Sequence, residues 1–402
     1  MRKNVKSILL VLVAISVFAF MLPSQAAAAE TIKVGIVLPL TGPQAKFGEI
    51  EKQSFDMALE EINGGGGVKG MKLEFIMEDD TGRPEVGRSV VEKLINKDKV
   101  VMLGGGYSSS VVYGVAGVAQ QNRVPFLINT GAADKITEQG WDYVFRLNPP
   151  VSEYASGVET FLAEVVKPKD AVILHENSLF GTKGAKSFKK SCEKLGIKVL
   201  MVEGYEHGGI DFKPVLVKVK QMNPDLIYMI SYIMDASLLM RQARELKLTP
   251  KLFVGGAAGF TLPEFDQNAG KAANFVVSAT LWHQVLPLPG AMDYFNRFKA
   301  RYNKDTEYHG AEAYAAAYVI KDVLQRAKSF SPEDIKQALS ETKLMTVFGP
   351  VKFISYDKKT NQNRLTTYVV QWQHGKLQLI WPKNLANAKY VYPVDWLKNW
   401  GY

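Results

Sequence analysis

Cysteine and histidine are scarce in this chain of 402 residues, and their scarcity excludes several kinds of chemistry. The one cysteine, Cys192, can form no internal disulfide and stands in a helical pattern. The five histidines are dispersed, with no H-E-x-x-H motif and no pair at metal-ligand spacing, and no G-x-S-x-G motif occurs. We therefore predict no metal, no cofactor and no catalytic site, which describes a protein that is not an enzyme.

Long apolar runs are absent apart from one near the start, the fifteen residues 8–22. A membrane-spanning helix needs roughly 20 such residues. The run follows three basic residues and precedes 24–29, whose small side chains fit a signal-peptidase site. We interpret residues 1–29 as a cleaved signal peptide. No cysteine follows that would carry a lipid anchor, and export without disulfides favours the bacterial periplasm.

Concentrated charge of one sign is lacking too. The formal charge is +9, and removing 1–29 takes away three of the 49 basic residues and no acidic one, which leaves 46 against 40 and a charge of +6. The remaining lysines are scattered beside Glu and Asp on amphipathic helices, as in 183–194. A nucleic-acid-binding protein would need them clustered on one face with stacking aromatics. We therefore predict no nucleic-acid partner.

The sequence does contain a regular alternation of strand-like and helix-like segments, which is typical of a parallel α/β sheet. We predict strands at 31–40, 71–78, 100–103, 125–129, 171–175, 198–203, 226–231 and 252–255. We predict helices at 49–62, 84–96, 109–121, 184–195, 212–222 and 236–246. The predicted fold class is therefore α/β, with doubly wound, Rossmann-like sheets.

The two halves of this pattern match each other in detail. A Phe-Gly pair follows the first strand of each half, at Phe47 and at Phe180. After the third strand, Tyr107 stands 60 residues beyond Phe47, and Tyr232 stands 52 residues beyond Phe180. This repetition indicates a duplicated unit, and each half has the size of a domain. We therefore predict two similar lobes.

The carboxyl ends of the strands are the predicted binding edge, because open parallel sheets bind ligands there. The strongest candidate is 104–110 (GGGYSSS), which follows a strand and opens a helix. Free N–H groups and serine hydroxyls at a helix N-terminus favour an anion, and the lack of Lys or Arg favours a carboxylate over a polyphosphate. The alternative role is ordinary helix capping by Ser108 or Ser109, which we expect in either case.

A second glycine-rich segment, 65–70 (GGGVKG), has the spacing of a dinucleotide-binding loop. It leaves a predicted helix and leads into a predicted strand, whereas a phosphate-binding loop must leave a strand and open a helix. We interpret it as a helix stop and turn. This order argues against an exported enzyme with a Rossmann-like cofactor site.

Several segments occur in order over nearly the whole chain after residue 29: IKVGIVLPLTGPQAKFGE, ALEEINGGGGVKGMKLE, MEDDTGRPE, and LLMRQARELKL with FVGG. Together they resemble the leucine/isoleucine/valine-type periplasmic binding proteins of ABC importers. The resemblance implies a type I periplasmic binding fold, in which two lobes joined by a three-strand hinge clamp a ligand between them. It also implies a monomer whose partners are an ABC permease and its ATPase.

Carried over by position, the resemblance implies ligand-binding residues at the strand ends. Ser108 would bind a ligand carboxylate through its hydroxyl and amide, with help from Ser109, and Thr130 would contact the ligand through its backbone. Aromatic side chains would line the cleft in both lobes: Phe47, Tyr107, Phe180 and Tyr232.

Two positions depart from the family pattern. Ala132 stands where the amino-acid binders have a hydroxyl for the α-amino group, and Ala257 stands where they have an acid. A buried ammonium without an opposite charge costs several kcal/mol. We therefore expect an aliphatic or aromatic carboxylate, unless another acid such as Asp235 or Glu153 replaces the missing partner of an amino acid.

The resemblance also divides the chain. It implies an N-terminal lobe of 30–148 with 280–358 and a C-terminal lobe of 149–279 with 359–402. The predicted function is delivery of a small carboxylate-bearing solute to an ABC importer by hinge closure. The alternative is a ligand-binding sensor of the same fold that signals to a membrane receptor. We expect the aromatic-rich segment 381–402 to pack across the lobes.

Overall fold

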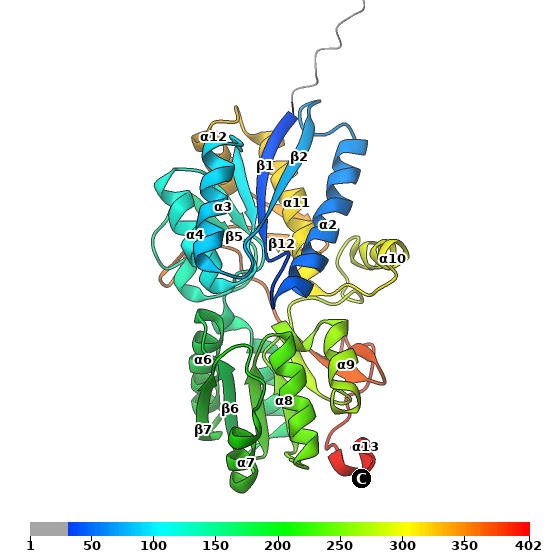
Figure 1. Cartoon of the computed structure of the whole chain (residues 1–402). Coiled ribbons are helices and arrows are strands. Elements are labelled where there is room, and N and C mark those ends of the chain that lie inside the picture. The colour runs from blue at the N-terminus through cyan, green and yellow to red at the C-terminus, as the bar shows by residue number, and fades with distance from the viewer. Residues whose placement is uncertain (1–30) are drawn as a thin grey trace, which may run out of the picture. The chain divides into compact units, whose positions relative to one another are not determined.

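The computed structural model describes residues 31–402, and the predicted signal peptide lies outside them (Figure 1). Within this range no helix has the length and hydrophobicity that a membrane span requires. The described strands form two seven-stranded sheets and one two-stranded hairpin, β11 (Leu344–Thr346) with β12 (Gly349–Val351). Each large sheet is the centre of one lobe.

The first sheet has the strand order β13-β14-β5-β4-β3-β1-β2. Its strands are β1 (Thr31–Leu38), β2 (Lys72–Asp79), β3 (Met102–Gly105), β4 (Phe126–Ile128), β5 (Val144–Arg146), β13 (Ile354–Tyr356) and β14 (Lys359–Gln362). The neighbouring strands β1, β3, β4, β5 and β14 pair in parallel in that order, and β13 and β14 form an antiparallel hairpin.

Helices cover both faces of the first sheet, so its central strands are apolar and fully buried. α2 packs with α11 on one face, and α3 packs with α4 on the other (Figure 1). The helices of this lobe are α2 (Ala45–Gly64), α3 (Pro84–Asn96), α4 (Ser109–Gln121), α10 (Ala291–Tyr302), α11 (Tyr308–Arg326) and α12 (Pro332–Ser340).

The second sheet has the order β16-β15-β10-β9-β8-β6-β7. Its strands are β6 (Asp170–Glu176), β7 (Lys198–Tyr205), β8 (Leu226–Ile230), β9 (Leu252–Gly255), β10 (Val277–Thr280), β15 (Tyr368–Gln373) and β16 (Lys376–Trp381). Its helices are α5 (Ser156–Phe161), α6 (Leu179–Leu195), α7 (Lys213–Met222), α8 (Ile233–Glu245), α9 (Pro263–Ala269) and α13 (Trp396–Trp400). β15 and β16 are antiparallel to their neighbours, and β6 to β10 are parallel.

The two sheets confirm the predicted fold class and repeat one strand order, in which the first strand lies between the second and the third. The Phe-Gly pairs occupy equivalent places. A Cβ added at Gly48 would lie 2.0 Å from the carbonyl oxygen of Pro39, and one added at Gly181 would lie 2.0 Å from that of Glu176. In both lobes glycine therefore lets the first helix approach the loop that follows the first strand.

The structure differs from the sequence-based expectations mainly at the edges of the sheets. Each sheet has a fifth strand and a terminal hairpin that the alternating pattern did not predict. β14 pairs with β5 through Gln362 and Arg146, so Lys359–Gln362 lies in the first sheet, whereas the predicted lobe boundary placed it in the second. We therefore propose that the third crossover runs between β14 and β15.

The aromatic C-terminal segment does not pack across the lobes as expected. Trp396 and Trp400 are buried against Phe253 in the second lobe, with ring centroids 4.9 and 6.3 Å from it. The indole N–H of Trp396 donates to the carbonyl of Pro250. The segment thus completes the core on one face of the second sheet.

Candidate functional site

The loop between β3 and α4 brings backbone N–H groups to the end of the first sheet. Gly105 and Gly106 have φ of +94° and +97°, and a Cβ on Gly106 would meet Val112 at 2.7 Å. α4 then begins at Ser109, and its first N–H groups have no partner within the helix. These groups form the electropositive end of a helix of 13 residues.

The two serines of this loop do not cap the helix as expected. Ser108 occupies the N-cap position, but its side chain makes no capping hydrogen bond. Ser109 Oγ instead accepts hydrogen bonds from the N–H groups of Ala132 and Ala133, at 3.1 and 3.0 Å. Ser109 therefore ties the loop after β4 to the start of α4, and its hydroxyl hydrogen remains free to donate.

A cavity of about 20 Å³ lies where the strand ends of the two lobes meet. It is lined by Tyr107, Ser109, Thr130, Ala132, Tyr154, Phe180, Tyr232, Ala258, Tyr308 and His309. Six of these were predicted site residues: Tyr107, Ser109, Thr130, Ala132, Phe180 and Tyr232. The structure thus brings together strand-end residues that lie up to 125 positions apart in the sequence.

The other three predicted site residues lie behind the lining. Phe47 stacks on Tyr107, with ring centroids 4.4 Å apart. Ser108 is buried beside Tyr232; burial raises the pKa of Tyr232, and hydrogen bonding to Ser178, Ser108 and Gln44 opposes that rise. Tyr232 thus lines the cavity with its ring and contacts the polar side chains behind it with its hydroxyl group.

Ala257, the third of them, is fully buried, and the next residue, Ala258, lines the cavity in its place. Both alanines have positive φ, +66° and +48°, which L-residues rarely adopt. The N–H of Ala258 donates to Tyr308 Oη at 2.9 Å. This bond joins the second lobe to the start of α11 in the first.

Tyr154, Ala258, Tyr308 and His309 were not predicted, although all four line the cavity. The strand-end rule could not find Tyr154, Tyr308 or His309, because none of them directly follows a predicted strand. Phe47, Tyr107, Tyr232 and His309 nevertheless form one ring cluster, with the Tyr107 and Tyr232 centroids 5.9 Å apart. Rings from both lobes are therefore in contact at the cavity.

No acidic residue lines the cavity, but two buried carboxyl groups lie behind Thr130. Thr130 Oγ1 is 2.8 Å from Glu51 Oε1 and 3.0 Å from Glu312 Oε2. One hydroxyl hydrogen cannot serve two carboxylates, so one carboxyl group must carry a proton. Burial raises the pKa of Glu51 to about 8 and raises that of Glu312 well above its usual range.

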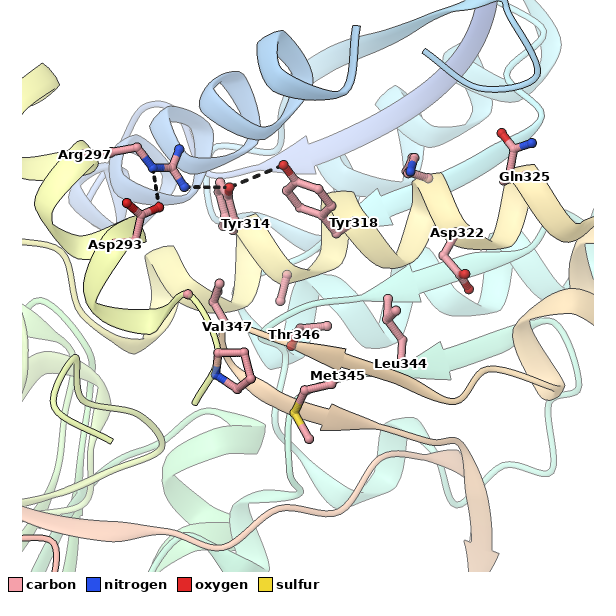
Figure 2. Close-up of a pocket in the computed structure, with 14 residues that line it drawn as sticks. Asp293, Arg297, Tyr314, Tyr318, Asp322, Gln325, Leu344, Met345, Thr346 and Val347 are labelled. Carbon is pink, nitrogen blue, oxygen red and sulfur yellow. Dashed lines mark hydrogen bonds and ion pairs between the residues drawn. The ribbon is translucent and has the colours of Figure 1, made fainter. Parts of the chain in front are cut away.

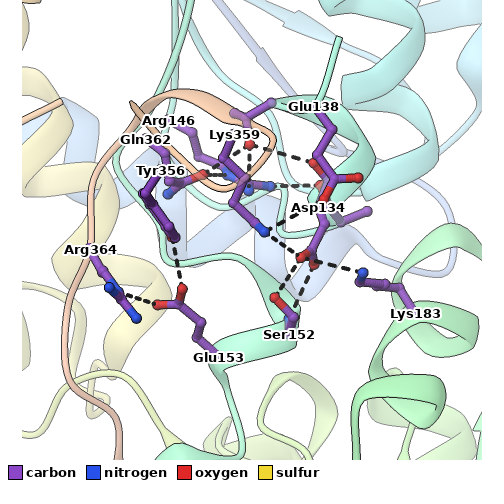
Figure 3. Close-up of polar contacts among 12 residues, drawn as sticks. Asp134, Glu138, Arg146, Ser152, Glu153, Lys183, Tyr356, Lys359, Gln362 and Arg364 are labelled. Carbon is purple, nitrogen blue, oxygen red and sulfur yellow. Dashed lines mark hydrogen bonds and ion pairs between the residues drawn. The ribbon is translucent and has the colours of Figure 1, made fainter. Parts of the chain in front are cut away.

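Neither acid that could replace the missing amino-group partner reaches the cavity. Asp235 Oδ2 is 2.6 Å from Nδ1 of His207, and its other oxygen accepts from Gly208 N–H. Glu153 accepts from Tyr356 Oη and from Arg364. Both carboxylates thus already have partners of their own, as Figure 3 shows for Glu153.

A polar cluster lies around Asp134 and Arg146 (Figure 3). Arg146 is fully buried and donates to the carbonyls of Gly131 and Ala133, which flank the lining residue Ala132. Asp134 lies 3.0 Å from Lys359 Nζ and 3.5 Å from Lys183 Nζ. Lys183 belongs to α6, so this last ion pair joins the second lobe to the first.

A second cavity, of about 340 Å³, lies in the first lobe between α10, α11 and β11 (Figure 2). Arg297 donates there to Asp293 and to Tyr314 Oη, at 2.7 and 3.0 Å. None of the predicted site residues lines it. Within 31–402, no group of three or more His, Cys, Asp or Glu is placed to hold a metal ion.

Comparison with known proteins agrees with this architecture. Residues 31–376 match the family described as periplasmic binding protein. The chain is 26% identical over 397 residues to Leu/Ile/Val-binding protein homolog 7 of Brucella melitensis. The matched region covers 95% of this chain and 99% of that protein.

Two solved structures share the fold. One is the branched-chain amino acid transporter substrate binding protein LivJ from Streptococcus pneumoniae in complex with isoleucine (TM-score 0.80, 24% identity, 90% of this chain and 100% of that chain). The other is a solute binding protein of an ABC transporter from R. palustris in complex with benzoate (TM-score 0.78, 18% identity, 90% and 98%). Because the family match spans most of its length, the chain belongs to the periplasmic binding protein family.

Proposed function

We propose that this protein captures a small carboxylate-bearing solute outside the cytoplasm and delivers it to an ABC importer, without carrying out a reaction. The observation that carries the proposal is the cavity at the facing strand ends, with a helix N-terminus and a free hydroxyl hydrogen at one side and aromatic rings around it. Its periplasmic location and its action as a monomer are parts of the same proposal.

The first lobe supplies the groups that would bind the carboxylate. Ser109 Oγ uses its lone pairs to accept from Ala132 and Ala133, so its hydrogen can be donated to a ligand oxygen. The unpaired N–H groups at the start of α4 add a favourable field. A hydrogen bond to a charged group contributes about 1.5–3 kcal/mol.

The remaining lining favours an apolar body without an ammonium group. Tyr154, Phe180, Tyr232 and Tyr308 supply rings, and no lining side chain carries a negative charge. An ammonium in this cavity would therefore lack a direct ionic partner, at a cost of several kcal/mol. This supports an aliphatic or aromatic organic acid over a plain α-amino acid.

Ligand entry requires the lobes to separate. A cavity of about 20 Å³ has room for about one water molecule, so a larger ligand needs Tyr232 to move away from Phe47 and Tyr107. Hinge bending at the three crossovers between the sheets would supply this motion, and closure would present both lobes to the permease.

The test is calorimetric titration of residues 30–402 with a panel of aliphatic and aromatic carboxylates and the matching α-amino acids. We expect at least one carboxylate to bind and to raise Tm, and its amino-acid counterpart to bind less tightly. Binding of no carboxylate would contradict the proposal. Uptake of the bound solute by vesicles that carry the cognate permease and ATPase would distinguish transport from the signalling alternative.

A further inference from the structure

Two buried polar atoms of the cavity residues have no hydrogen-bond partner within 31–402: Tyr107 Oη and His309 Nε2. The side chains are only 5% and 1% exposed. Their rings lie side by side, with centroids 5.5 Å apart. Since an unsatisfied buried polar group costs about 1–3 kcal/mol, two of them in one small cavity indicate a place where a ligand atom completes the bonding.

The imidazole of His309 is held in one orientation. Its Nδ1 is 2.8 Å from Glu307 Oε1, which also accepts from the N–H of His309 at 3.0 Å. Glu307 Oε2 accepts from Thr261 Oγ1 at 2.9 Å, and the His309 ring stacks on Tyr308. A carboxylate at Nδ1 requires a proton there, so in the neutral imidazole Nε2 is left as an acceptor.

Tyr107 supplies the complementary donor. Its ring is fixed by stacking on Phe47, and burial raises the pKa of its phenol, which therefore keeps its proton. The pair thus offers one O–H donor and one nitrogen acceptor. A single hydroxyl group within reach of both atoms would satisfy both, because its oxygen can accept from Tyr107 while its hydrogen is donated to His309. A carboxylate would satisfy only Tyr107.

We propose that Tyr107 and His309 form a hydroxyl-binding subsite, so that the ligand is a carboxylate that also carries a hydroxyl group on its apolar body. The inference rests on the proposed function, in which the carboxylate itself lies at Ser109 and the start of α4. Glu307 is a positioning residue in this arrangement, since it acts only through His309.

The experiment compares ligands that share one skeleton. Benzoate is titrated beside its three hydroxy isomers, and 4-methylpentanoate is titrated beside its 2-hydroxy and 2-amino derivatives, the latter being leucine. We expect a hydroxy acid to bind about tenfold more tightly than its parent, because its hydroxyl gains hydrogen bonds to Tyr107 and His309 and loses those to water. We also expect it to bind more tightly than leucine binds.

Variants assign this preference to the two side chains. Tyr107→Phe and His309→Leu should each reduce the ratio of hydroxy-acid to parent affinity to about one, and His309→Gln, which keeps an acceptor, should restore part of it. Tyr294→Phe removes a buried hydroxyl outside the cavity and should leave the ratio unchanged. Circular dichroism establishes that each variant is folded, and Tyr107→Phe alone decides the question if the His309 variants do not fold.

The failures are distinguishable. If no carboxylate of either series binds, the proposed function fails, and the subsite fails with it. If parent and hydroxy acids bind equally, or if Tyr107→Phe leaves the ratio unchanged, the subsite is overturned while carboxylate binding stands. Tighter binding of leucine than of either acid would overturn it in favour of an ammonium site.

Discussion

The two lobes share one framework but bring different groups to the cavity. In the first lobe, the third strand ends in glycines and serines, and α4 presents its N-terminus through Ser109. At the equivalent place in the second lobe, the N-cap residue of α8 is Tyr232, and α6 adds Phe180. Duplication thus supplied two similar scaffolds, on which the first lobe carries hydrogen-bond donors beside the rings of Tyr107 and Tyr308, whereas the second carries mainly rings.

The buried polar groups behind the cavity differ in the same way. In the second lobe, Asp235 is paired with His207. In the first lobe, Glu51 and Glu312 share Thr130 and have no cationic partner among their hydrogen bonds. The scaffold therefore tolerates a paired carboxylate in one lobe and a protonated carboxyl group in the other.

The largest expected effect tests whether the frameworks are equivalent. Gly48→Ala and Gly181→Ala each place a Cβ 2.0 Å from a backbone carbonyl oxygen. Because neither the helix nor the loop can move without disturbing its sheet, we expect each substitution to lower the free energy of unfolding by about 3 kcal/mol or more. Urea denaturation of both variants measures the loss.

Gly64→Ala is the matched control, since its added Cβ meets nothing within 4 Å. It should leave stability unchanged or raise it slightly. A severe loss at Gly48 with none at Gly181, or the reverse, would contradict the equivalence of the two lobes.

The next effect concerns the carboxyl pair of the first lobe. Burial raises the pKa of Glu51 to about 8, from about 4.5 in the unfolded chain. Between these values the folded state binds the extra proton, so stability falls as the pH rises. We expect Glu51 to contribute a loss on the order of 3 kcal/mol between pH 5 and 8. Glu312, whose pKa is also raised by burial, adds to the slope in the same direction. Glu51→Gln, whose side chain is neutral at every pH, should therefore reduce the slope without abolishing it.

Thermal unfolding across this pH range measures the slope, with Glu164→Gln on the exposed surface as the control. His207 contributes in the same direction, because its raised pKa gives stability that is present below pH 6.5 and lost as the pH rises through that pKa. An unchanged slope in Glu51→Gln would show that Glu51 is not protonated in the folded protein.

The sequence predicted the repeated part of the molecule better than the unique part. The helices 84–96 and 109–121 and the strand 252–255 match α3, α4 and β9 at both ends, because periodicity and glycine signals agree there. The fifth strands and terminal hairpins were missed, since β5 and β14 are short and their pairing joins residues more than 200 positions apart. Local pattern carries no information about such contacts.

The site shows the same division. Strand-end reasoning named Tyr107, Ser109 and Thr130 as candidates, and all three line the cavity, because the carboxyl ends of parallel strands meet at one edge. Tyr308 and His309 begin α11, which follows α10 and not a strand, so the strand-end rule does not apply to them. The role of Glu51 was equally hidden, since its burial results from the packing of α2 against α11.

A smaller effect tests whether the first lobe binds the carboxylate through Ser109. Ser109→Ala removes the free hydroxyl hydrogen, and we expect it to weaken carboxylate binding by about 2 kcal/mol, or roughly thirtyfold. Ser231→Ala is the control at the equivalent strand end of the second lobe; Ser231 is fully buried, accepts from Tyr205 and does not line the cavity. It should lower stability while leaving affinity unchanged.

Ser108→Ala decides between the two serines. The sequence assigned the carboxylate to Ser108 first, whereas the structure places Ser109 on the cavity and Ser108 behind it. We therefore expect Ser108→Ala to weaken binding less than Ser109→Ala, as measured by titration of the same carboxylate. The opposite order would return the principal role to Ser108.

The smallest expected effect concerns the ion pair by which Asp134 of the first lobe contacts the second lobe. Burial acts to raise the pKa of this carboxyl, but Ser152, Lys359 and Lys183 together lower it, so it is charged and bound from both lobes. Lys359 pairs with it inside the first lobe, whereas Lys183 reaches it from α6 of the second at 3.5 Å and is partly exposed.

Lys183→Met should therefore weaken ligand binding by less than about 1 kcal/mol, as expected for an exposed ion pair, and should leave the unfolding of the ligand-free protein unchanged. The reason is that an ion pair between the lobes favours closure, which only the ligand-bound protein requires. Titration of the ligand at low and high salt measures this loss of affinity. Salt screens the ion pair, so the difference in affinity between Lys183→Met and the wild type should disappear at high salt. Lys186→Met, on an exposed position of the same helix, controls for the lost charge. An equal effect of the two variants would mean that the pair with Asp134 contributes nothing to closure.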